Sequence, residues 1–178
     1  MKMRKLLCLV LSLVLVLSLA ACGKSGGKKE KSGETPESVA EKYMKYDIAG
    51  DAAKVYELFH EKVVDEIKGD KDADAWKDWV DDISEEREDA FKAKEDQLGG
   101  KLKVSYEISD TRDLKGDDLE DIQEMYEKLG VEVKAAKVVE FDVELKGQDD
   151  EEEFTVEVTL IQVDLFWYVD IYSALYVI

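Results

Sequence analysis

The sequence predicts an α+β domain, because helical and strand patterns occupy different parts of the chain. Between Pro36 and Leu98 apolar residues recur every three or four positions, which is the period of an amphipathic helix. From Leu102 onward apolar and polar residues alternate, as they do in half-buried strands. Helices first and about four strands last favour N-terminal helices packed on one mainly antiparallel sheet.

Residues that start and stop helices divide the first part of this pattern. Thr35 can cap a helix whose first turn contains Pro36, and Gly50 is expected to end it. Asp51 can cap the next helical segment, along which we expect one continuous apolar stripe. That stripe consists of Val55, Phe59, Val63 and Ile67.

The stretch GDKDADAWKDWVDD, residues 69–82, allows two interpretations. Its aspartates have nearly the spacing of a calcium-binding loop; they are Asp70, Asp72, Asp74, Asp78 and Asp81. Such a loop needs glycine at its sixth place and glutamate at its twelfth, where this chain has Ala75 and Asp81. We therefore predict no metal site but a helix start, capped by Asp72 or Asp74. Trp76 and Trp79 are expected to anchor this helix in the core.

Four segments after Gly100 have the strand pattern, and a short helix is predicted over 116–130, between the first two. The strand segments are 101–109, 131–147, 151–164 and 166–172. In the third strand the apolar parity shifts between Leu160 and Ile161, which predicts a β-bulge. The acidic run Asp149–Glu153 lies at a predicted hairpin turn, where five repelling carboxylates favour a solvated loop tip.

The N-terminus has the three parts of a secretory signal. A basic start is followed by the apolar run Leu6–Leu19, which is short for a membrane span, and then by Leu-Ala-Ala-Cys at 19–22. This ending resembles the lipobox of bacterial lipoproteins. The resemblance implies that residues 1–21 are removed as a signal peptide. It also implies that Cys22 is lipidated and anchors the chain in the cell membrane on the extracytoplasmic face.

Residues 22–35 are rich in glycine, serine and lysine and are expected to form a flexible tether, followed by a single domain over 36–178. Cys8 leaves with the signal peptide and Cys22 carries the lipid, so no thiol remains for a disulfide, a redox pair or a zinc site. The formal net charge of −18 disfavours nucleic acid as a partner, because nucleic-acid binding needs positive charge.

Two stretches of the domain are similar to a known family. PESVAEKYMKYDIAGDAAKVYELF, residues 36–59, resembles the opening helices of small Firmicutes lipoproteins with a nuclear-transport-factor-like (cystatin-like) cone. TVEVTLIQVDLFWYVD, residues 155–170, resembles the last hairpin of that family. The resemblance implies a curved antiparallel sheet wrapped over helices, often with a pocket. It implies no single activity, because a fold does not determine a function.

Candidate catalytic chemistry is sparse in this sequence. His60 is the only histidine, and such a lone residue is more often found at a helix boundary than in a catalytic group. The tyrosines Tyr43, Tyr56, Tyr106 and Tyr126 fit either a pocket lining or the core. We expect no metal and no cofactor.

The C-terminal strand presents an aromatic face, which we interpret as an interface for a protein or peptide partner or for a second copy. Its members are Phe166, Tyr168, Tyr172 and Tyr176. Coverage of this face by the domain's own segments is the alternative. The sequence thus favours a membrane-anchored, extracytoplasmic, non-catalytic binding module. A small-molecule pocket enzyme is the alternative function, and a calcium-modulated module is a weaker one.

Overall fold

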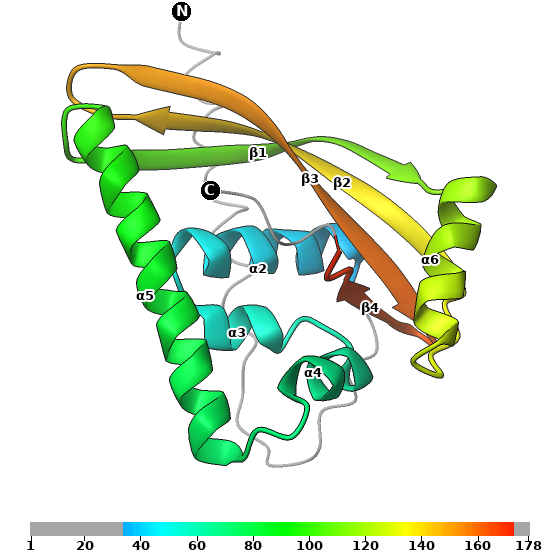
Figure 1. Ribbon diagram of the computed structural model, residues 1–178. Coiled ribbons are helices and arrows are strands. Elements are labelled where there is room, and N and C mark those ends of the chain that lie inside the picture. The colour runs from blue at the N-terminus through cyan, green and yellow to red at the C-terminus, as the bar shows by residue number, and fades with distance from the viewer. Residues whose placement is uncertain (1–33, 173–178) are drawn as a thin grey trace, which may run out of the picture. The chain divides into compact units, whose positions relative to one another are not determined.

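A four-stranded antiparallel sheet organises residues 34–172, the part of the chain that the computed structural model describes (Figure 1). The strands follow one another in the order β1-β2-β3-β4. Their bounds are Lys103–Asp113 for β1, Ala135–Lys146 for β2, Glu151–Val163 for β3 and Phe166–Val169 for β4. The sheet is open and curves over the N-terminal helices, so the predicted α+β class with about four strands is confirmed.

The structure describes five helices, three of which begin at a capping residue that the sequence predicts. They are α2 (Pro36–Ile48), α3 (Ala52–Tyr56), α4 (Glu61–Lys68), α5 (Ala73–Gln97) and α6 (Asp117–Glu127). The side chains of Thr35, Asp51 and Asp72 accept hydrogen bonds from backbone N–H groups in the first turns of α2, α3 and α5. Within residues 34–172, none of these helices has both the length and the apolar composition of a membrane span.

The predicted continuous stripe from Val55 to Ile67 is wrong, because the chain breaks between α3 and α4. In this break the Leu58 carbonyl accepts a hydrogen bond from the backbone N–H of Val169 in β4, at 2.9 Å. His60 then caps α4: its Nδ1 accepts a hydrogen bond from the backbone N–H of Lys62. The loop thus covers the edge of the short strand β4, which would otherwise be open.

Each face of the sheet packs against a separate apolar core. The first core lies between α2 and one face, and its largest buried side chains include Tyr43, Met44, Phe141, Leu145 and Leu160. The second core joins α4 and α6 to the other face and includes Val63, Ile122, Tyr126, Val133 and Ile161. The break before α4 therefore assigns Val55 and Phe59 to the first core and Val63 to the second.

The predicted bulge at Leu160 and Ile161 is also wrong. The β2–β3 register runs without interruption from Ala135↔Gln162 to Lys146↔Glu151. Both Leu160 and Ile161 are fully buried because consecutive strand residues point to opposite faces and each face has its own core. The register shift lies instead in β1, between Ile108 and Asp110.

Helix α5 packs mainly against α3, and Val80 is its only buried residue. The expectation that Trp76 and Trp79 are core anchors is wrong, because both are only half-buried. The carboxylate of Asp47, which is 1% exposed, forms an ion pair with Arg87 of α5. Arg87 also interacts with the Tyr43 hydroxyl, yet burial dominates and raises the pKa of Tyr43 to about 12.

Truncations in β3 test the two-faced core. Leu160→Ala and Ile161→Ala should each lower the free energy of unfolding by about 2–5 kcal/mol, since each removes fully buried methyl groups from a different core. The measurement is urea denaturation. Glu153→Ala, at an exposed position of the same strand, is the control and should change stability by less than about 0.5 kcal/mol. A large cost at only one of the two sites would mean that one face is uncovered.

Alkaline pH tests the burial of Tyr43. The unfolded chain releases this proton near pH 10, whereas the folded chain keeps it until about pH 12, so its contribution is complete below pH 10 and is lost through this window. Tyr43→Phe should therefore make the decline of unfolding free energy between pH 10 and 12 shallower by about 1.4 kcal/mol per pH unit. Below pH 10 the free energies of unfolding of wild type and Tyr43→Phe should keep a constant difference, because the contribution of Tyr43 is complete there. Equal slopes for wild type and Tyr43→Phe would contradict the assignment.

Candidate functional site

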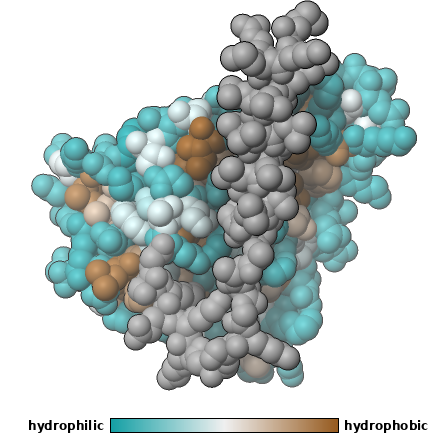
Figure 2. Space-filling model, turned by 180° about the vertical axis from the view of Figure 1, so that it is seen from behind, coloured by the Kyte–Doolittle hydropathy of each residue, from teal (hydrophilic) through white to brown (hydrophobic). Residues whose placement is uncertain are grey.

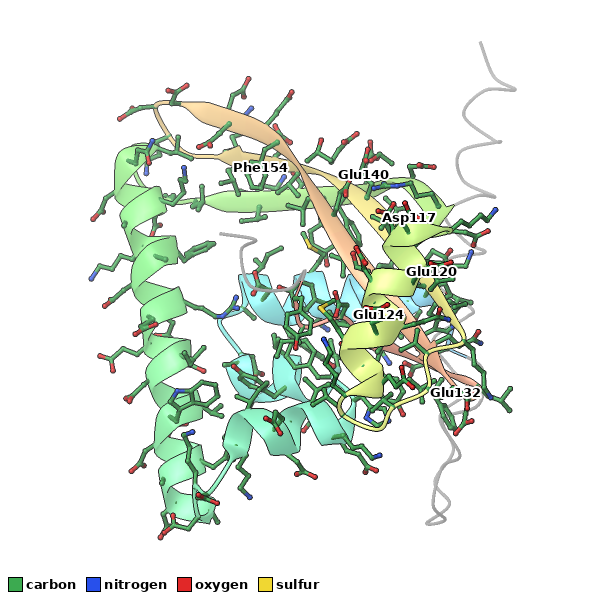
Figure 3. The ribbon with its side chains drawn as sticks, turned by 45° about the vertical axis from the view of Figure 1, so that its right-hand side comes forward. Asp117, Glu120, Glu124, Glu132, Glu140 and Phe154 are labelled. Atoms are coloured by element: carbon green, nitrogen blue, oxygen red, sulfur yellow. The ribbon has the colours of Figure 1, made fainter. Side chains whose placement is uncertain are left out.

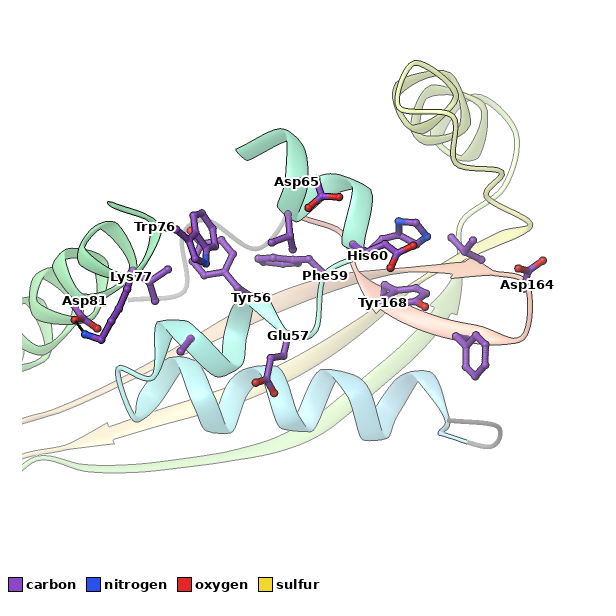
Figure 4. A pocket seen from close by; sticks show the side chains of 16 residues that line it. Tyr56, Glu57, Phe59, His60, Asp65, Trp76, Lys77, Asp81, Asp164 and Tyr168 are labelled. Carbon is purple, nitrogen blue, oxygen red and sulfur yellow. Dashed lines mark hydrogen bonds and ion pairs between the residues drawn. The ribbon is translucent and has the colours of Figure 1, made fainter. Parts of the chain in front are cut away.

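An open groove of about 860 Å³ lies between α3, α4, the first turns of α5 and the β3–β4 turn (Figure 4). We call it the aromatic groove because six rings line it. These belong to Tyr56, Phe59, His60, Trp76, Phe166 and Tyr168. The volume is within the usual range for ligand sites.

The break between α3 and α4 places most of these rings. Tyr56 ends α3, and Phe59 and His60 lie in the loop that hydrogen-bonds to β4. The ring of His60 lies edge-on to that of Tyr168, with 5.1 Å between the centroids. The ring centroids of Tyr56 and Trp76 lie 5.3 Å apart, and Trp76 lies near the start of α5. Segments distant in sequence thus contribute to one aromatic row.

Carboxylates dominate the charged groups of the groove, which contains five of them and a single lysine. Lys77 forms an ion pair with Asp81, and Asp164 pairs with Lys134 at 3.1 Å. The other three carboxylates, of Glu57, Glu61 and Asp65, are exposed and have no ion-pair partner among residues 34–172. The groove therefore combines aromatic surface with uncompensated negative charge.

Burial is the main cause of the shifted pKa values of the imidazole and the tyrosine hydroxyls in the groove. It lowers the pKa of His60, which favours the neutral imidazole, although nearby Glu61 acts in the opposite direction. Burial also raises the pKa of Tyr56 and of Tyr168, and the charges of Glu61 and Asp164 add to the effect at Tyr168. In the described part of the chain no carboxylate hydrogen-bonds to His60, whose Nδ1 is already used to cap α4.

The predicted aromatic interface is divided by the structure. Phe166 and Tyr168 line the groove, and α4 partly covers Tyr168 through His60. Tyr172 is 56% exposed, and its ring lies edge-on to that of Tyr126. Tyr176 lies outside the described residues, as does Cys22. The strand itself ends at Val169, so Tyr172 does not continue the sheet face that Phe166 and Tyr168 share.

Buried polar groups fix the segment that follows β4. Asp170 is 3% exposed, and its carboxylate accepts a hydrogen bond of 2.8 Å from the hydroxyl of Tyr126. Burial, together with the negative charge of Asp170, raises the pKa of Tyr126. Tyr43 and Tyr126 are thus core residues, whereas Tyr106 is half-buried and borders a second hollow on the sheet, of about 660 Å³.

The acidic stretches do not form a metal centre within the part of the chain that is described. There, no three or more of the side chains of histidine, cysteine, aspartate and glutamate gather as metal ligands. Asp72 caps α5, and Asp149 and Asp150 are exposed at the β2–β3 turn. Seen from behind the view of Figure 1, the part of the surface that grey atoms do not cover is mostly hydrophilic (Figure 2).

Sequence reasoning missed the groove because its walls meet only through the α3–α4 break. The sequence pattern placed Trp76 in the core and did not identify the carboxylates of α4 as candidate site residues. One local signal existed: His60 is a residue that can cap a helix, and it stands inside the apparent stripe. Comparison with family models, curated proteins and solved structures finds no match for this chain.

Proposed function

We propose that this chain is a lipid-anchored, extracytoplasmic binding module whose domain holds a partner without catalysis. The aromatic groove is its binding surface. The observation that carries the proposal is the groove itself, in which rings from α3, α4, α5 and β4 line a solvent-open hollow. Aromatic side chains supply large contact area at little cost in conformational entropy, which suits recognition of a partner.

The polar groups of the groove support binding over catalysis. A pocket enzyme requires ionisable groups that converge and hydrogen-bond to one another. Here His60 is engaged in capping α4, Asp81 in pairing with Lys77, and Asp164 in pairing with Lys134. These engagements give the ionisable groups local structural roles and leave the rings and three exposed carboxylates to meet a ligand.

The proposed location rests on the sequence of the N-terminus. After removal of residues 1–21, the lipid on Cys22 holds the chain in the cell membrane, and the lysine-rich tether gives the domain reach. Two or more acyl chains anchor a protein stably. The partner is then a protein or peptide on the extracytoplasmic side, since the acidic charge of the chain disfavours nucleic acid.

Substitution of Cys22 tests the anchor. Cys22→Ala should abolish the incorporation of labelled palmitate and leave the chain about 21 residues longer, because the cysteine is both the acceptor and the last lipobox residue. Labelling and mass spectrometry of the membrane fraction measure both effects. Cys8→Ala, within the signal peptide, is the matched control and should be processed normally. Palmitate incorporation in Cys22→Ala would refute the anchor.

Site-specific photocrosslinking tests the groove as a binding surface. Benzoylphenylalanine in place of Trp76 should give one adduct of defined mass in living cells, because this position faces the groove. The same probe in place of Phe91 is the control, since Phe91 is half-buried on the same helix but does not line the groove. No adduct at position 76, or the same adduct at both positions, would contradict the proposal.

A further inference from the structure

The charge of the groove points to a cationic ligand. Glu57, Glu61 and Asp65 are exposed at the groove and have no ion-pair partner among the described residues. They stand beside rings that partly exclude water, where an attraction between charges is less screened than on an open surface. An ammonium or guanidinium group would compensate this local negative charge.

The rings favour the same chemistry. The face of an aromatic ring has a negative potential and attracts cations. The domain already uses this interaction next to the groove, where Nζ of Lys71 lies over the ring of Trp79, 5.6 Å from its centroid. Trp79 in turn packs against Trp76 and Tyr56, which line the groove. The aromatic cluster thus already holds one ammonium group, that of Lys71, beside the groove.

The shape of the groove fits an extended chain better than a compact ligand. Figure 4 shows Trp76, Tyr56, Phe59, His60 and Tyr168 in a row that runs from α5 to the β3–β4 hairpin. Apolar side chains that also line the groove, including Val64 and Val163, can pack against the aliphatic stems of lysine and arginine. Aromatic rings, apolar side chains and carboxylates thus line the same groove.

We propose that the aromatic groove binds an extended peptide segment that carries lysine or arginine side chains. The cationic heads pair with Glu57, Glu61 and Asp65, and the stems lie on the rings. This inference names the ligand class of the proposed binding function and so rests on it. The segment belongs to a separate extracytoplasmic protein or peptide.

Short synthetic peptides test this ligand class. The probe is a fluorescent octapeptide of alternating lysine and serine, added to the full-length lipidated protein in uncharged detergent micelles. Fluorescence anisotropy at 0.15 M salt should show saturable binding, and a glutamate–serine octapeptide of equal length should not bind. No saturable binding of the lysine peptide, or equal binding of both peptides, overturns the proposal.

Charge-matched triple variants locate the binding. Glu57→Gln, Glu61→Gln and Asp65→Asn together should weaken the lysine peptide at least tenfold, because three contacts with cations are lost. The control is Asp117→Asn, Glu120→Gln and Glu124→Gln on α6, which removes the same charge from residues that do not line the groove (Figure 3). It should change affinity less than twofold. Equal weakening would mean that the whole acidic surface, not the groove, attracts the peptide, and the proposal would be wrong.

A ring substitution separates this site from simple charge attraction. Trp76→Leu should weaken the lysine peptide about threefold or more while leaving the net charge unchanged, and Phe91→Leu should leave its affinity unchanged. Equal affinity of Trp76→Leu and wild type would overturn the role of the rings. A groove-specific crosslink at position 76 without any peptide binding would refute the ligand class and leave the binding function standing.

Discussion

One backbone hydrogen bond organises this domain, between the Leu58 carbonyl and the Val169 amide at 2.9 Å. It joins a loop near the start of the domain to the last strand of the sheet. Because the loop must present its carbonyl to β4, the helix that begins at Ala52 stops at Tyr56 and a new one begins at Glu61. The loop that carries this carbonyl covers the edge of β4, α4 follows the loop and packs in the second core, and the aromatic groove lies at the junction. Fold and candidate site are thus two results of one connection.

Pairing of buried carboxylates explains how so acidic a chain holds its helices. The chain has 43 acidic and 25 basic residues, so a charge taken into the core needs a specific partner. Asp47 meets Arg87 and thereby fixes α5, whose apolar contact with the rest is slight. Asp170 accepts a hydrogen bond from Tyr126 and fixes the segment after β4 to α6. Losing Arg87 would leave the buried charge of Asp47 without its ion-pair partner, which costs more than an exposed pair contributes.

Sequence patterns predicted those parts of the fold that depend on interactions between residues close together in the chain. Thr35, Asp51 and Asp72 cap helices because capping needs only residues two or three positions away. The alternation of apolar and polar residues correctly predicts β2 and β3, because successive side chains of a strand point to opposite faces of the sheet. The break at Leu58 was not predictable in this way, since its partner Val169 lies more than a hundred residues later. The bulge predicted at Leu160 and Ile161 was wrong for a related reason. The prediction assumed that one sheet face is exposed to solvent, whereas a second core buries that face.

Charge and aromatic surface have separate tasks in the proposed site. An acidic domain attracts cations over its whole surface and speeds their encounter, but such a field does not choose one location. The carboxylates of Glu57, Glu61 and Asp65 resemble many others on the chain, so charge alone would distribute a basic peptide over the surface. The aromatic row is where those carboxylates coincide with rings that can receive aliphatic stems and cationic heads. In the proposed site, selectivity therefore arises from the rings, most of which meet at the break between α3 and α4 where Leu58 accepts the hydrogen bond from Val169.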